Sequence, residues 1–342
     1  MYSGIDLNIA WFILIGILLT GYAILDGFDL GIGALYLGVK DDTERRLMLN
    51  SIGPVWDGNE VWLVTGGGAL FAAFPHVYAT VFSGFYVALM LLLFVIIFRA
   101  VAIEFRSKKE SKKWRQSWDI AFSTSSIVIA LLMGTALGNI IVGIPLDSEY
   151  EANISLLEML KPYPLLVGIT TVALFMMHGA IYGVLKTEGA LHDKLRSWVN
   201  NTIIFFVICY VTTTMVTLIF VPHMLDNIKA NPWLFGVAFI NMLAIANIPR
   251  EIHHGRDFRA FLSSAVSILA LFSLFAIGMF PTIVPSAPNP EFSLNIYNAA
   301  SSRKTLEIMF TMTLIGMPMV IAYTTAVYWI FRGKVKLESH SY

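Results

Sequence analysis

The chain has 342 residues, of which 57% are hydrophobic and only 13% are charged, and its mean hydropathy is +0.71. Average soluble domains carry about 25% charged residues, so this composition indicates an integral membrane protein. The formal net charge is zero, which excludes the bulk positive field of a nucleic-acid-binding protein. The single cysteine, Cys209, lies in an apolar run and excludes a disulfide framework and a Cys-x-x-Cys metal site.

Apolar runs of about 20 residues, the length that crosses a bilayer as a helix, recur along the whole chain. They predict an all-α membrane protein with about nine transmembrane helices, in one polytopic domain over residues 1–342. We expect two four-helix bundles, roughly 1–143 and 163–331, with one peripheral helix. The first run lacks a preceding basic segment and is too long for a cleaved signal. The predicted spans are 9–36, 50–74, 78–103, 118–142, 163–186, 199–223, 233–249, 259–283 and 305–331.

The second span is the uncertain one, because it contains Pro54, several polar residues and three consecutive glycines. The distribution of Lys and Arg decides whether it is counted. With nine spans, most basic residues fall on the side of the C-terminus, and only four fall on the other side: Lys161, Lys229, Arg303 and Lys304. Basic loops stay in the cytoplasm, so the N-terminus is expected outside the cell and the C-terminus inside.

Four acids lie within the first two predicted spans, and neither span contains a Lys or Arg to neutralise them: Asp26, Asp29, Asp57 and Glu60. A charge near the bilayer centre costs at least roughly 2.5–3.5 kcal/mol, and such residues are functional by default. Each acid is therefore expected to stay protonated, face water, or find a partner on another helix or subunit. The competing explanation is a purely structural role.

The spacing of these acids suggests a route for protons. Asp26 and Asp29 are three residues apart, as are Asp57 and Glu60, so each pair shares one helix face. Asp57 should lie about 10 Å and Glu60 about 15 Å below the inner surface, where Glu104 ends the third span. Together the five carboxyls predict a path for proton transfer from the cytoplasm toward the membrane midplane.

Basic residues and histidines receive more ordinary interpretations. Arg99, near the inner end of the third span, is expected to extend its side chain to the membrane surface. The basic run 106–115 is expected to be a lipid-facing loop that fixes topology. His178 alone lies near a span centre, and a lone histidine is more often packed or hydrogen-bonded than a ligand. We therefore assign no haem, metal or other cofactor to this chain.

Several long motifs are more specific than these patterns. Residues 21–33 read GYAILDGFDLGIG, and residues 42–46 read DTERR. Residues 52–62 read IGPVWDGNEVW, residues 66–75 read GGGALFAAFP, and residues 82–86 read FSGFY. In this order, over about residues 20–115, the series closely resembles subunit II of cytochrome bd-type quinol oxidases. The glycines at 27, 31 and 33 are expected to allow close helix packing rather than phosphate binding.

The resemblance implies a bacterial terminal oxidase that oxidises quinol and reduces O₂ to water. It implies that haem b and haem d belong to a partner, subunit I, and that this chain stabilises that subunit and carries no haem. The position of Asp57 belongs in the family to a proton path, and Glu104 falls where the family has an acid in the same path. Membrane lipid or quinone and a small accessory subunit are further candidate partners, and nucleic acid is not.

Two alternatives compete with this interpretation. A proton- or cation-coupled membrane transporter would use the same acids to bind and release its ion. A purely structural scaffold would tolerate exchange of Asp57 for asparagine. The residues alone support the oxidase subunit and the transporter about equally, and the motif series favours the oxidase subunit.

Overall fold

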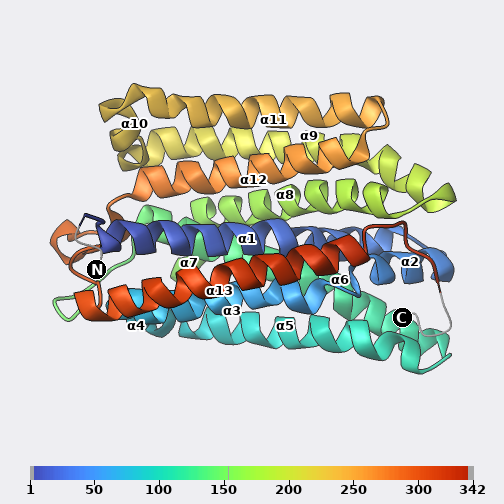
Figure 1. Cartoon of the computed structure of the whole chain (residues 1–342), viewed down its shortest axis with the longest axis horizontal. Coiled ribbons are helices and arrows are strands. Elements are labelled where there is room, and N and C mark those ends of the chain that lie inside the picture. The colour runs from blue at the N-terminus through green and yellow to red at the C-terminus, as the bar shows by residue number, and fades with distance from the viewer. Residues whose placement is uncertain (1–3, 153, 338–342) are drawn as a thin grey trace.

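The computed structural model describes residues 4–152 and 154–337, which form an elongated stack of nearly parallel and antiparallel helices (Figure 1). Within these residues, eight helices are long and apolar enough to cross a membrane. They are α1 (Leu7–Leu35), α5 (Tyr86–Phe105), α6 (Lys112–Val142), α8 (Pro162–Lys186), α9 (Gly189–Phe220), α11 (Phe235–His253), α12 (Asp257–Met279) and α13 (Arg303–Ile330).

The ninth predicted span corresponds to α3 (Trp56–Ala73). Its composition is too polar for it to count with the eight, because its first turns contain Asp57, Asn59 and Glu60. It nevertheless packs along α1 and returns from the end that carries α2 (Asp42–Ile52) to the end that carries α4 (Pro75–Gly84) (Figure 1). With α3 included, α1 starts at one end of the stack and α13 finishes at the other, as nine crossings require.

The remaining elements are short and lie at the two ends of the stack. They are α7 (Leu156–Met159), α10 (Asp226–Ala230), β1 (Thr282–Val284), β2 (Leu294–Asn295) and the 3₁₀ turns Tyr36–Gly38, Arg106–Lys108, Pro222–Leu225, Pro232–Leu234 and Pro290–Phe292. Local chemistry explains several starts: the Asp6 carboxylate caps α1, Asp41 caps α2, and proline occupies the first turn of α4 and α8.

The helices form the two bundles that the sequence predicts, with one helix outside them. In the first bundle α1 contacts α3 and α6, and α5 contacts α6. In the second, α8 contacts α9 and α12, and α11 contacts α12. The bundles join where α8 packs against α1 and α6, while α13 lies on α1 and α3 and is buried at Leu306 only. The proposed division at residues 143 and 163 remains a prediction.

The joint between the bundles is a close crossing of α1 and α8. A Cβ atom at Gly31 would lie 1.9 Å from the carbonyl oxygen of Phe175, and one at Gly179 would lie 2.4 Å from the carbonyl carbon of Gly31. The backbones are therefore in direct contact, as in other membrane helix pairs with small residues at the interface. The expectation that Gly31 permits close packing is confirmed.

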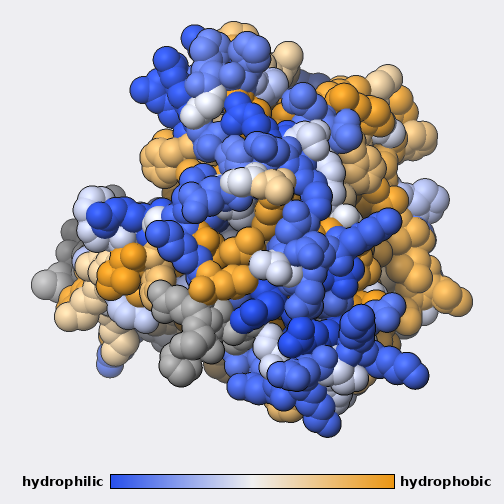
Figure 2. Space-filling model, turned by 90° about the vertical axis from the view of Figure 1, so that its right-hand side faces the viewer, coloured by the Kyte–Doolittle hydropathy of each residue, from blue (hydrophilic) through white to orange (hydrophobic). Residues whose placement is uncertain are grey.

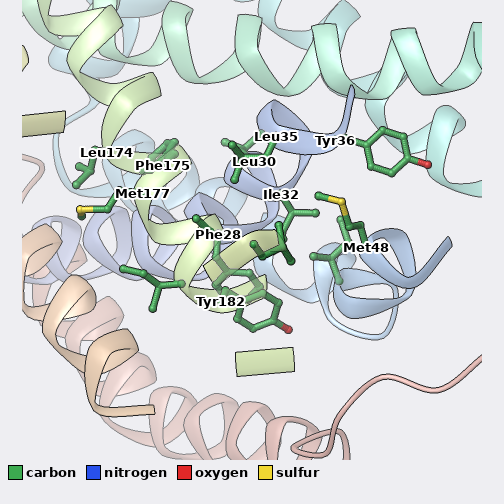
Figure 3. Packing of buried hydrophobic residues seen from close by; sticks show 14 of the residues in the cluster. Phe28, Leu30, Ile32, Leu35, Tyr36, Met48, Leu174, Phe175, Met177 and Tyr182 are labelled. Atoms are coloured by element: carbon green, nitrogen blue, oxygen red, sulfur yellow. The ribbon is translucent and has the colours of Figure 1, made fainter. Parts of the chain in front are cut away.

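A buried apolar core surrounds this crossing (Figure 3). The ring of Phe28 on α1 stacks on that of Tyr182 on α8 with centroids 3.8 Å apart. Met48 of α2 and Ile32 of α1 belong to the same cluster, so α2 is packed into the bundle joint. This packing fixes the position of α1 along the axis of the stack, and with it the positions of Asp26 and Asp29.

The two ends of the stack differ. At one end the longest loops pair with each other: the amide of Ile144 donates to the carbonyl of Pro285, and β1 and β2 form an antiparallel hairpin. The other end, which carries α2 and the turns α5–α6, α8–α9 and α11–α12, is covered by hydrophilic residues with apolar ones at its rim (Figures 1 and 2). Together with α2 and the helix ends beside them, those turns contain most of the basic residues.

Candidate proton site around Arg99

Arg99 on α5 is the centre of a buried charged cluster. Its Nη2 donates to Oδ1 of Asp26 at 2.5 Å, and its Nη1 donates to Oδ2 of Asp26 at 2.9 Å. Neither side chain is exposed to solvent. Two parallel hydrogen bonds between a guanidinium and a carboxylate form the strongest geometry available to such a pair. The pair ties α5 to α1 inside the membrane.

Glu60 on α3 adds a second carboxyl to the same guanidinium. Its Oε1 lies 3.0 Å from Nη1 of Arg99, and 20% of its side chain is exposed. Arg99 thereby connects three helices of the first bundle, because Asp26, Glu60 and Arg99 come from α1, α3 and α5. An arginine has several donors in a rigid fork, which lets one residue serve two carboxyls.

Asp29 lies beside this group without bonding to the cation. The nearest guanidinium nitrogen, Nη2 of Arg99, is 4.0 Å from Oδ2 of Asp29, and the carboxyl has no solvent exposure. Oδ2 instead accepts a hydrogen bond of 2.7 Å from the amide of Asn59. The oxygen of the same amide accepts from the Tyr328 hydroxyl at 2.8 Å, so α13 is attached to the cluster.

These contacts correct one expectation and agree with another. Arg99 does not extend to the membrane surface, because its side chain is fully buried and held by Asp26 and Glu60. The acids of the first two spans do lack a basic partner in their own helices, but Asp26 and Glu60 find one on α5. An isolated cation inside the bundle would be very costly, and the carboxylates compensate that cost.

A second buried cluster lies at the hydrophilic end of the stack. Asp119 on α6 accepts from Nε of Arg106 at 2.5 Å, from Nη1 of Arg45 at 2.7 Å and from the Tyr36 hydroxyl at 2.9 Å. Arg106 also binds Asp42, which Arg115 binds in turn. The basic run 106–115 is therefore not simply a lipid-facing loop, because Arg106 is buried.

Asp42 is the most exposed acid of this second cluster. Partial burial opposes its charged form, but the hydrogen bond and charge of Arg106, together with the charge of Arg115, lower the pKa of Asp42 below its ordinary value. The cluster joins α2, the end of α5 and the start of α6 at the membrane surface, and it anchors the helix end on which Glu104 lies.

The amino-acid sequence of the chain matches one family of known proteins. A family model described as cytochrome bd terminal oxidase subunit II matches residues 7–331. The chain belongs to this family. It is 35% identical to cytochrome bd-I ubiquinol oxidase subunit 2 of Escherichia coli K12, over 97% of this chain and 96% of that protein. It is 31% identical to cytochrome bd ubiquinol oxidase subunit 2 of Bacillus subtilis, over 96% and 97% respectively.

The fold agrees with a solved structure of the same kind. A chain in the structure of bd oxidase from Geobacillus thermodenitrificans superposes with a TM-score of 0.80, covering 96% of this chain and 99% of that one. At 16% identity this likeness concerns the fold only. As a bd oxidase subunit II, the chain is a multi-pass membrane subunit of an oxidoreductase complex. This family membership favours the oxidase subunit over the transporter.

His178 of this subunit II does not present a free nitrogen to a haem iron. Its Nδ1 lies 2.7 Å from the Ser264 hydroxyl, its Nε2 lies 2.9 Å from the carbonyl oxygen of Ile24, and its ring stacks on Phe261. Both nitrogens are thus engaged, which confirms the packed and hydrogen-bonded role. Within the described residues, no three His, Cys, Asp or Glu side chains form a metal-binding group.

Asp57 and Glu104 lie outside the cluster around Arg99. Asp57 is in the first turn of α3, one turn before Glu60, and it is exposed on the chain's own surface. Glu104 is partly buried in the last turn of α5, five residues and about 7.5 Å of helix rise beyond Arg99. The structure thus brings Asp26, Asp29 and Glu60 together around Arg99, with Asp57 and Glu104 nearer the hydrophilic end.

Three members of the cluster were missed by sequence reasoning. Arg99 carried a usable signal, because it lies four residues inside its predicted span, in a protein with several intramembrane acids. Asn59 and Tyr328 gave no such signal, since a single amide or phenol in a span has no pattern. Their contact joins positions 269 residues apart and follows only from the packing of α13 on α3.

Proposed function

We propose that this chain acts as the non-haem subunit of a quinol-oxidising, O₂-reducing complex, in which it stabilises the haem-bearing subunit I and contributes a proton path. Haem b and haem d, which supply the electron-transfer and oxygen-reducing chemistry, would be held by subunit I. The names of the relatives, which are ubiquinol oxidase subunits, support the substrate class. The engaged nitrogens of His178 support haem binding outside this chain.

The proposed orientation follows from charge. The hydrophilic end with the basic turns would face the cytoplasm of a bacterial cell, and the end with the β1–β2 hairpin would face outward. The N-terminus is then outside and the C-terminus inside. Protons would enter from the end where Glu104 and Asp57 lie.

The observation that carries the proposal is the position of Asp57 at the foot of an exposed apolar helix face. On α3 the side chains of Val61, Val64 and Phe71 are 53%, 74% and 59% exposed, and they follow Asp57 at helical spacing. Such a face suits burial against other membrane helices. A carboxyl beside it would be costly in lipid and is better accommodated at a protein interface. Subunit I is the partner that the family provides.

In the proposed path Glu104 receives protons at the surface and Asp57 passes them toward subunit I. Glu60 follows Asp57 by one helical turn, so the path would touch the Arg99 cluster, where Asp26 and Asp29 lie. Asp26 is engaged by two hydrogen bonds from Arg99, and that pairing favours a positioning role for it over proton transfer.

The experiment is purification of the complex through a tag on this chain, followed by a visible spectrum and haem quantitation. We expect haem b and haem d bands in a complex that contains a larger partner, and unchanged bands in a His178→Gln variant. A tagged chain that purifies alone without haem, or a variant that assembles but lacks one haem, would contradict the proposal.

A further inference from the structure

We infer that Asp29 holds an exchangeable proton in the resting protein, whereas Asp26 is the hydrogen-bonded ion-pair partner of Arg99. This inference deepens the proposed function, because it assigns different roles to acids that would lie along the same proton path. It follows from how three carboxyls share one guanidinium.

The first argument is the balance of charge. Asp26, Asp29 and Glu60 surround Arg99, and the side chains of Asp26, Asp29 and Arg99 have no solvent exposure. Full ionisation would leave two negative charges without a compensating cation in this group. Uncompensated buried charge is far more costly than a neutral carboxyl, so the cluster lowers its free energy by retaining a proton.

The second argument is the set of hydrogen bonds around each oxygen of Asp29. Oδ2 accepts from the neutral amide of Asn59, and its distance of 4.0 Å to Arg99 is too long for a hydrogen bond. Oδ1 is buried without a hydrogen-bond partner among the described residues. An ionised oxygen in that situation pays the full desolvation cost of a charge, whereas a neutral carboxyl pays much less.

The other two acids are poorer places for the proton. Both oxygens of Asp26 accept hydrogen bonds from Arg99, and a proton on either would remove one of them. Glu60 is bonded to Arg99 at 3.0 Å and keeps 20% of its side chain exposed, so its charge is stabilised by the cation and by contact with the surroundings. Asp29 lies 4.0 Å from the guanidinium, too far for a hydrogen bond, and has no solvent exposure, so its charge is the least stabilised of the three.

Asn59 fixes which oxygen of Asp29 carries the proton. Its Oδ1 accepts from Tyr328, and its Nδ2 donates to Asp29 and to the carbonyl oxygen of Leu25. The amide therefore cannot turn round to accept a proton from Asp29. The Asp29 hydroxyl is accordingly on Oδ1, with Oδ2 left as the acceptor.

The test is infrared spectroscopy of the purified oxidase complex at neutral pH. A protonated carboxyl has a C=O stretching band that is separate from the carboxylate and amide bands and shifts when its proton exchanges in D₂O. We expect the wild-type-minus-Asp29→Asn difference spectrum to contain this band. The matched control is Asp226→Asn, which replaces an exposed acid of α10 outside the cluster by its amide and should keep the band.

Three results would overturn the assignment: no such band lost in Asp29→Asn, the same band lost in Asp226→Asn, or a band that does not shift in D₂O. If Asp29→Asn fails to assemble, the wild-type complex labelled with ¹³C in its aspartate carboxyls must shift the band, and a band that shifts only with labelled glutamate contradicts the assignment. Failure of the proposed path would instead appear as normal turnover in Asp57→Asn.

Discussion

Arg99 and Asp26 form a two-pronged ion pair between α5 and α1, with hydrogen bonds of 2.5 and 2.9 Å and no solvent exposure of either side chain. Removing one member of a buried ion pair destabilises a protein by roughly 3–5 kcal/mol, because it leaves the other charge uncompensated. Replacing both by apolar residues removes that penalty for the pair itself and leaves only the partly exposed Glu60 without its cation.

We therefore predict that Arg99→Leu and Asp26→Leu each lower the thermal stability of the complex strongly. The double variant should lose less stability than the sum of the two single losses. Midpoints of thermal inactivation of the solubilised complex measure this coupling. The matched control is Arg303→Leu, which breaks the exposed pair with Glu307 and should cost about 0–1 kcal/mol. Strict additivity of the two buried substitutions would contradict the prediction.

The contact of α1 with α8 predicts that alanine at two different glycines of α1 has very different effects on the yield of assembled complex. At Gly31 a Cβ atom would overlap the Phe175 carbonyl oxygen, whereas at Gly16 nothing lies within 4 Å. Gly31→Ala should reduce assembled complex, since overpacking costs about 1–3 kcal/mol or more. Gly16→Ala should leave the yield unchanged. Equal yields, measured by quantifying the complex in membranes, would refute the close crossing.

The sequence could predict the spans and the acids, because hydropathy and charge are local properties. All nine predicted spans have a helix in the structure, including the polar α3 (Trp56–Ala73). The partners of the acids could not be predicted in the same way. Asp26 meets Arg99 across 73 positions, and Asp119 meets Arg45 across 74, so both pairs depend on how helices pack. A basic residue inside a span looks the same whether it reaches the surface or a buried acid.

Asp42 predicts a pH dependence of stability at the hydrophilic end. Arg106 and Arg115 lower its pKa in the folded protein below the unfolded value, so its ionised form contributes stability above the unfolded pKa. That contribution is lost as the pH falls through the lowered folded pKa. We expect Asp42→Asn to reduce thermal stability at neutral pH and to flatten its decline in acid. Parallel stability curves for variant and wild type, followed by tryptophan fluorescence, would rule this out.

The proposed orientation predicts opposite accessibility for two exposed positions. Glu110 follows α5 at the hydrophilic end, and Leu157, which is 81% exposed, lies in α7 in the long loop that follows α6. A cysteine at 110 should react with an impermeant reagent only after cells are opened, and one at 157 should react in intact cells. The native Cys209 is buried and gives little background. The reverse pattern would invert the topology.

The most direct test of the proposed proton path is the oxygen consumption of an Asp57→Asn complex with its full haem content. Asparagine keeps the shape of aspartate and removes the exchangeable proton, so we expect turnover to fall by roughly 10²-fold, at the low end for a positioned proton-transfer group. Asp57→Glu should retain part of the rate, and Glu104→Gln should lose less. Asp226→Asn, at an exposed acid of α10 near the opposite end, is the control and should turn over normally. A fully assembled, haem-replete Asp57→Asn complex that consumes oxygen at the wild-type rate would contradict the account.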